Sequence, residues 1–121
     1  MSPAELGDAI LRATGGAGLR VADERDLQEQ LAALLAAAGV AHQREAPLGP
    51  RSRVDFLVGG IVLEVKVGGG LSDLTRQVVR YAEHATVLGV LVVTTRRAHR
   101  DLPDQVLGKP LAVLCIGDLL L

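Results

Sequence analysis

Two apolar segments joined by a Gly-Gly pair at 59–60 constrain the fold more than any other feature of the chain. The segments span 53–58 and 61–67, and a two-residue glycine turn is the connection that antiparallel hairpins prefer. Such a turn fixes the register, so Asp55 is predicted to pair with Glu64. Paired residues share a face of the sheet, so one face of this hairpin is predicted to be entirely apolar. That face comprises Val54, Phe56, Val58, Ile61, Leu63 and Val65.

The opposite face of the hairpin carries charged residues: Arg53, Asp55, Glu64 and Lys66. Two carboxylates that face each other across strands repel. The segment around Glu64, Ile-Val-Leu-Glu-Val-Lys-Val, is typical of an interior strand, where an unpaired charge costs free energy. The pattern therefore indicates a cation between the two acids. The alternative is a solvated polar face, which leaves the apolar setting of Glu64 unexplained.

Length and composition limit the possible classes of protein. The 121 residues suit one domain, with a helix and Gly-rich loop at 1–20 before a core at 22–116. One Tyr, one Phe and no Trp predict an aliphatic core, and a net charge of -1 excludes a global basic field. The single Cys115 excludes an internal disulfide and indicates a reducing, cytoplasmic setting. No apolar run reaches membrane-spanning length, so no membrane partner is expected.

Two helices are predicted in the first part of the chain. The first spans 3–13, with Ser2 as its N-cap, and the second spans 23–38 with leucines at helical spacing. Glu24 lies at the N-terminal end of the buried stripe of the second helix, whereas Glu29 points away from it. Glu24 is therefore a candidate for a site, although an acid in the first turn also favours the helix dipole.

The remaining elements alternate between strands and helices. A strand at 40–48 precedes the hairpin. After it we predict a flexible Gly loop at 68–70, a helix at 71–84 capped by Ser72, a strand at 87–95 buried on both faces, a basic loop at 96–100, a connection at 102–108, a strand at 110–116 and a terminal turn at 117–121. The order α-α-β-β-β-α-β-β predicts an α/β (α+β) fold with a central mixed sheet flanked by helices.

The acidic hairpin resembles the active-site motif of the PD-(D/E)xK nuclease superfamily. Asp55 matches the Asp of the motif, Glu64 its second acid and Lys66 its lysine, while Val54 stands where the motif has Pro. Glu24 matches the glutamate that many members carry on the first core helix. The resemblance covers most of the chain and implies a restriction-endonuclease-like αβββαβ core.

The helix at 71–84 adds a second similarity. Gln77 and Tyr81 resemble the Gln-x-x-x-Tyr motif of RecB-like members of the superfamily. The compact layout is similar to archaeal-type Holliday junction resolvases. These likenesses imply a Mg²⁺-dependent endodeoxyribonuclease, with Mn²⁺ as a substitute.

The chemistry of the residues fits such an enzyme. Mg²⁺ prefers oxygen ligands and is held by few carboxylates, which Asp55 and Glu64 supply, with the Val65 carbonyl as a third ligand. Glu24 would hold a second metal or orient the attacking water. Lys66 would position that water or stabilise developing negative charge, and Gln77 would orient Lys66 or contact a phosphate.

DNA is the expected partner. The candidate contacts are Arg51, Arg53, Arg76, Arg80, Tyr81, Arg96, Arg97 and Arg100. Solvated surface charge explains these arginines equally well, and Tyr81 is as well suited to packing in the core. No nucleotide cofactor is expected, because the Gly-rich segments lack the Lys-Ser/Thr of a P-loop. Glu45 and His84 fit ordinary surface and helix-end positions better than a site.

We therefore expect a metal-dependent nuclease, specifically a structure-specific endonuclease such as a Holliday junction resolvase. A symmetric DNA substrate needs paired active sites, so a homodimer is predicted. The alternatives are a restriction, repair or defence nuclease that works with a partner, and a non-catalytic nucleic-acid-binding module of the same fold.

Overall fold

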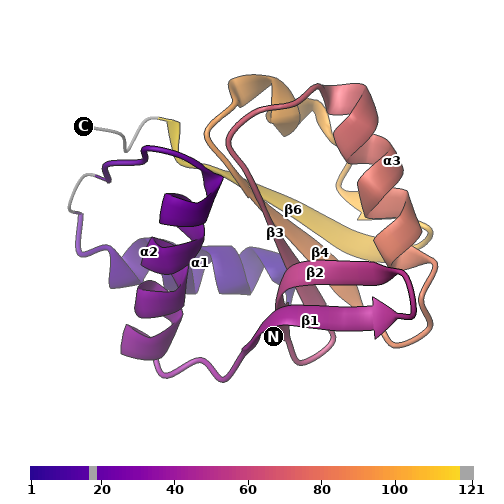
Figure 1. Cartoon of the computed structure of the whole chain (residues 1–121), viewed down its shortest axis with the longest axis horizontal. Helices are drawn as coiled ribbons and strands as arrows, with labels where there is room; N and C mark the ends of the chain where they lie inside the picture. Colours follow the sequence, from indigo (N-terminus) through magenta and orange to yellow (C-terminus); the bar gives the residue numbers. More distant parts are fainter. Residues whose placement is uncertain (17–18, 118–121) are drawn as a thin grey trace.

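A computed structural model describes residues 1–16 and 19–117 of the chain. Its elements are α1 (Pro3–Ala13), α2 (Glu24–Ala37), β1 (Gln43–Gly49), β2 (Ser52–Val58), β3 (Ile61–Lys66), α3 (Leu71–Ala82), β4 (Gly89–Thr94), the 3₁₀ helix η1 (Arg97–Asp101), β5 (Gln105–Val106) and β6 (Lys109–Cys115). The predicted mixed α/β architecture is confirmed (Figure 1). No helix among these described residues is long and apolar enough to cross a membrane.

The strands form one mixed sheet in the order β1-β2-β3-β4-β6-β5. β1, β2 and β3 are antiparallel neighbours, β3, β4 and β6 run parallel, and β5 pairs antiparallel with β6. Parallel neighbours need a crossover connection, which α3 provides between β3 and β4. Figure 1 shows α1 and α2 on one side of the sheet and α3 on the other.

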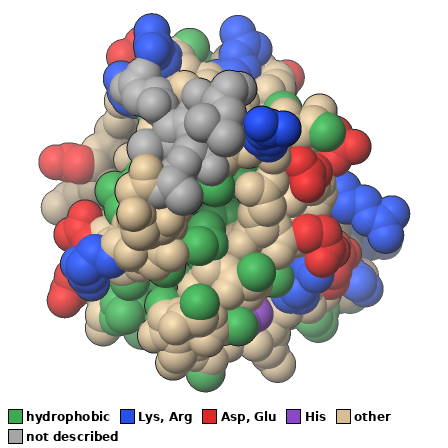
Figure 2. Space-filling view, turned by 90° about the vertical axis from the view of Figure 1, so that its left-hand side faces the viewer, with side chains coloured by type: hydrophobic (Ala, Val, Ile, Leu, Met, Phe, Trp, Pro, Cys, Tyr) green, Lys and Arg blue, Asp and Glu red, His purple; other side chains and the backbone are tan. Residues whose placement is uncertain are grey.

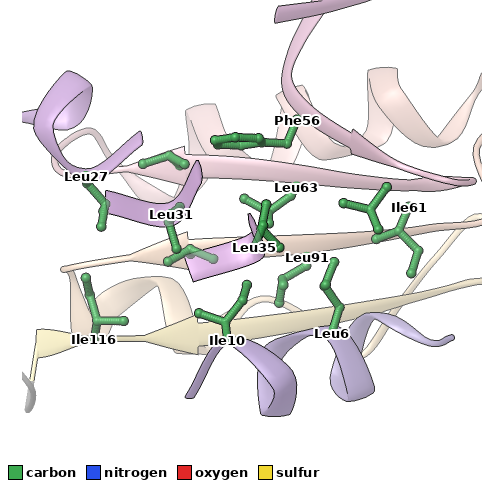
Figure 3. Close-up of a cluster of buried hydrophobic side chains, with 13 residues drawn as sticks. Leu6, Ile10, Leu27, Leu31, Leu35, Phe56, Ile61, Leu63, Leu91 and Ile116 are labelled. Atoms are coloured by element: carbon green, nitrogen blue, oxygen red, sulfur yellow. The ribbon is translucent and has the colours of Figure 1, made fainter. Parts of the chain in front are cut away.

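The first of two apolar cores lies between the sheet and the α1–α2 layer (Figure 3). Both helices have N-caps: Ser2 and Glu5 form a capping box on α1, and the Asp23 side chain accepts from the Asp26 N–H on α2. The buried members of this core are Leu6, Ile10, Leu27, Leu31, Leu35, Phe56, Val58, Ile61, Leu63, Val65, Leu91, Val93 and Ile116. The predicted leucine stripe of the second helix thus faces the sheet.

The second core lies between the sheet and α3. It includes Ala46, Val54, Val62, Leu74, Val78, Tyr81, Ala82, Val87, Val90 and Val92. Because β4 contributes to both cores, every one of its residues is buried, as its continuous apolar sequence predicts. The sheet therefore separates two layers of side chains, and its third strand can present residues to either layer.

The β2–β3 hairpin follows the predicted register only near its turn. Phe56 pairs with Leu63, and the two pairs nearer the turn also match the prediction. The predicted ladder pairs Asp55–Glu64, Val54–Val65 and Arg53–Lys66 are wrong, because β2 leaves β3 beyond Phe56 and continues along β1.

Val54 was predicted to share the apolar face of Phe56, which is also wrong. Phe56 lies in the core against α1 and α2, whereas Val54 lies in the core against α3. Residues two apart on a regular strand share a face, so β2 must twist sharply between them. This twist sits beside Asp55.

Three local predictions need smaller corrections. α3 begins at Leu71 after Gly70, with no side-chain cap, and Ser72 Oγ instead accepts a hydrogen bond from Arg76 Nη1 at 3.0 Å. The predicted basic loop at 96–100 is largely the helix η1, and the connection at 102–108 contains β5. The predicted terminal turn lies mostly outside the described residues.

Candidate functional site

Beyond Phe56 the strand β2 no longer pairs with β3, which leaves a stretch of the β3 backbone without a strand partner on that edge, and Asp55 occupies this place. The Asp55 Oδ2 atom accepts a hydrogen bond from the Val65 N–H at 2.8 Å. On the opposite edge of β3, the Lys66 carbonyl accepts from the Thr95 N–H at 3.1 Å. In a strand the N–H and C=O of one residue point to the same edge, so the Val65 carbonyl is directed to the side of Asp55.

Glu64, the next residue along β3, is held from the other layer by α3. It is 2% exposed. Gln77 Nε2 donates to Glu64 Oε2 at 2.7 Å, and the Tyr81 hydroxyl donates to the same oxygen. Gln77 and Tyr81 also contact each other, with Gln77 Nε2 donating to the Tyr81 oxygen at 2.7 Å. Their spacing of four residues places both on one face of the helix.

Asp55 lies close enough to Glu64 to raise the pKa of that buried acid. Burial, and then the hydrogen bond and negative charge of Asp55, raise the pKa of Glu64 to about 9. The Tyr81 hydroxyl and the charge of Lys66 act in the opposite direction. Burial and the neighbouring Glu64 carboxylate likewise raise the pKa of Tyr81. Near neutral pH the Asp55–Glu64 pair therefore retains a proton, which a bound cation would displace.

Lys66 and Glu24 flank this pair at the end of β3. Lys66 is half-buried and lies two positions after Glu64 in the chain. Both side chains therefore leave the same face of the strand. Glu24 is exposed at the start of α2, and its Oε1 accepts from the Val67 N–H at 3.4 Å. Glu24 thus binds the backbone one residue beyond Lys66, and it reaches the strand from the opposite layer to Gln77.

A cluster of three acidic ligands is not preformed. Within residues 1–16 and 19–117, no group of three or more His, Cys, Asp or Glu side chains is placed to hold a metal ion. Glu24 therefore does not join Asp55 and Glu64 in one ligand set. Two carboxylates and the Val65 carbonyl nevertheless fit Mg²⁺, which is commonly bound through one or two carboxylates and retains waters. The raised pKa of Glu64 beside Asp55 marks the same place as one that a cation would stabilise.

The predicted nucleic-acid contacts fall into two groups. Arg51, Arg53 and Arg80 are exposed and line a groove of about 600 Å³ beside Gln77 and Tyr81. Tyr81 itself is 4% exposed, so it presents little surface to a substrate. The other predicted arginines do not line this groove.

Those other arginines are engaged by the protein itself. Arg76 forms an ion pair with Asp73 on α3. Arg96 Nη1 donates to the Gly69 carbonyl at 2.8 Å, and Arg97 begins η1. On the face drawn in Figure 2, coloured Lys and Arg side chains are interspersed with Asp and Glu, so basic charge is not continuous there.

Sequence reasoning missed the residues that fasten the Gly loop after Lys66. His99 is fully buried, and its Nε2–H donates to the Gly69 carbonyl at 3.0 Å. Its Nδ1 lies 2.6 Å from Thr94 Oγ1, which in turn accepts from the Arg96 N–H. In the sequence, a single histidine among arginines is typical of a surface loop. The only available signal was its position directly after a strand that ends beside the site.

No protein-family model, curated protein or solved structure matches this chain.

Proposed function

We propose that the chain is a Mg²⁺-dependent nuclease that hydrolyses DNA phosphodiester bonds, with the restriction-endonuclease-like core that its motif implies. The observation that carries the proposal is the Asp55–Glu64 pair. Two acids lie together in a partly buried place, where Asp55 helps to raise the pKa of Glu64, at the point where one strand leaves the next. Lys66 stands on the same face of β3 as Glu64. This is the set of side chains that the sequence motif requires.

Asp55, Glu64 and the Val65 carbonyl would hold the ion. When bound, Mg²⁺ supplies Lewis acidity towards the attacking water and the scissile phosphate. Gln77 and Tyr81 fix the orientation of Glu64 through hydrogen bonds to Oε2, so the carboxylate does not have to be ordered when substrate arrives. Gln77 therefore acts on Glu64, rather than on Lys66 as the sequence suggested.

Lys66 would stabilise the negative charge that develops on the phosphate during cleavage. The residue is half-buried, and a charge acts more strongly in such a setting than in bulk water. Glu24 and Thr95 bind the peptide group that joins Lys66 to Val67. Glu24 accepts from the Val67 N–H, and the Thr95 N–H donates to the Lys66 carbonyl. These contacts fix the end of β3 and so the base of the lysine side chain.

We place the enzyme among structure-specific endonucleases of the Holliday-junction-resolvase kind, acting on DNA as a homodimer. Cleavage of two strands at a symmetric junction needs two active sites in a fixed relation. Elution at the mass of one 12.7 kDa chain at working concentration would contradict the dimer.

A cleavage assay tests the function. Four-way junction, duplex and single-stranded DNA and RNA are incubated with Mg²⁺ or Mn²⁺ and with wild type, Asp55→Asn or Lys66→Ala. Glu45→Gln, on the neighbouring strand, is the matched control. We expect metal-dependent products that both site variants lose and the control keeps. Identical products from wild type and Asp55→Asn would refute the site, and absence of cleavage would favour a non-catalytic binding module.

A further inference from the structure

The groove beside the Asp55–Glu64 pair is lined from two elements that are distant in the sequence. One wall is the turn between β1 and β2, residues 49–53, and the other is the side of α3 that carries Gln77 and Tyr81. Gln77 and Tyr81 also bind Glu64, so the groove borders the candidate site through these two side chains.

The charge of this groove is predominantly positive. Its walls carry Arg51, Arg53 and Arg80 against one acid, Glu83. All three arginines are exposed, and none of their side chains forms a hydrogen bond or ion pair with another described residue. This distinguishes them from Arg76 and Arg96, whose guanidinium groups are bound by the protein. Three unpaired guanidinium groups on two walls suit an extended anion.

The groove offers no aromatic surface for stacking bases. The chain has one Tyr, one Phe and no Trp, and Phe56 and Tyr81 are 0% and 4% exposed. His84 also lines the groove but is half-buried, and its ring lies close to Gly49. Proteins that hold single strands without sequence preference stack bases on exposed aromatic rings. A groove that relies on charge alone favours duplex, because its phosphate charge density is higher.

We propose that this groove binds the sugar–phosphate backbone of a DNA duplex flanking the cleavage site, through Arg51, Arg53 and Arg80, without reading its bases. The assignment rests on the nuclease function proposed above and narrows its substrate to double-stranded segments. Arg51, Arg53 and Arg80 are thereby kept among the predicted contacts, while Arg76 and Arg96 are removed from them. Binding is expected to depend on salt and to be indifferent to sequence.

Fluorescence anisotropy in EDTA, over a range of NaCl concentrations, tests the groove without cleavage. Labelled duplex and single strand of equal length are compared for wild type and Arg51→Ala/Arg80→Ala. Each phosphate contact contributes about 0.9 to the slope of log affinity against log salt, so the double variant should lower the slope by about 1.8. Arg51→Lys/Arg80→Lys keeps the charge and should keep most of the slope. Arg12→Ala/Arg25→Ala removes the same charge from α1 and α2 and should change nothing.

Tighter binding of single strand than duplex by wild type would overturn the proposal, as would a slope in the alanine variant equal to that of the control. Circular dichroism of each variant verifies that it is folded. The cleavage assay separates this inference from the function on which it rests. DNA cut by wild type but an unchanged salt slope in Arg51→Ala/Arg80→Ala refutes the groove alone. A lowered slope together with full cleavage by Asp55→Asn refutes the proposed active site and leaves the groove standing.

Discussion

The Asp55 carboxylate binds the Val65 N–H at 2.8 Å, where the β2–β3 ladder would otherwise continue. A side chain thus replaces a backbone partner at the unpaired edge of an interior strand. The same contact aligns Asp55 with the carbonyl of Val65 and with the neighbouring acid Glu64. The site and the break in the hairpin are therefore one feature.

Asp55→Ala should destabilise the protein. The substitution leaves the Val65 N–H without its partner, which costs about 1–3 kcal/mol when the group stays dry. Asp55→Asn retains an acceptor oxygen and should lose less. Urea denaturation at neutral pH without metal measures both free energies of unfolding. Equal stability of the two variants would show that the Asp55–Val65 hydrogen bond contributes nothing.

The stability of the metal-free protein should fall as pH rises. Burial and Asp55 raise the pKa of Glu64 from its ordinary value of 4.5 to about 9, so the folded state binds its proton more tightly than the unfolded chain does. The stabilisation from Glu64 is fully present below pH 4.5 and is lost progressively as pH approaches 9. Thermal melts across this range measure the effect.

Glu64→Gln should flatten that part of the pH profile, because the amide does not titrate. Glu29 provides a control of opposite sign, since the hydrogen bond and charge of Arg44 lower its pKa. Glu29→Gln should therefore leave the decline towards pH 9 intact. A pH profile of stability that is unchanged in Glu64→Gln would contradict the interpretation that Glu64 retains a proton near neutral pH.

Tyr81→Phe should move the activity to higher pH while preserving the fold. The ring remains packed in the core against α3, but Glu64 loses a donor that lowers its pKa. More base is then needed to free the carboxylate for a cation. The pH dependence of kcat/KM measures the shift, with Thr75→Val on the exposed side of the same helix as control. An unshifted pH dependence of kcat/KM would show that Tyr81 does not influence the titration of Glu64.

His99→Leu should loosen the loop that follows Lys66. The substitution removes the donor to the Gly69 carbonyl and leaves Thr94 without its buried partner, at a cost of about 1–3 kcal/mol. Hydrogen exchange of residues 67–70 should accelerate. His99→Gln, which can still donate to a carbonyl, should restore part of the protection. Unchanged exchange in both variants would show that His99 does not hold the loop.

The sequence was sufficient to predict the order of the longer helices and strands, because each of them carries its own periodicity, whereas η1 and β5 were missed. The leucines of α2 and the continuous apolar run of β4 are local signals of burial. The Gly-Gly turn likewise specified the first three hairpin pairs. These features depend on residues that are near one another in the chain.

The features that were missed depend on contacts between distant segments. After it leaves β3, β2 stays paired with β1, as at Ala46 and Val54, which no spacing within the hairpin reveals. His99 is buried where the Gly loop, thirty residues earlier in the chain, lies against it. The division of the arginines into bound and unbound groups also depends on partners such as Asp73 and Gly69.

Metal binding to the Asp55–Glu64 pair is the central claim, and calorimetric titration with Mn²⁺ tests it most directly. Two buffers of different ionisation enthalpy report proton release, and Asp55→Asn is compared with Glu45→Gln. We predict that wild type and Glu45→Gln bind the ion with release of a proton near neutral pH, and that Asp55→Asn does not bind it. Binding by Asp55→Asn as tight as by wild type, or no binding by wild type, would contradict the account.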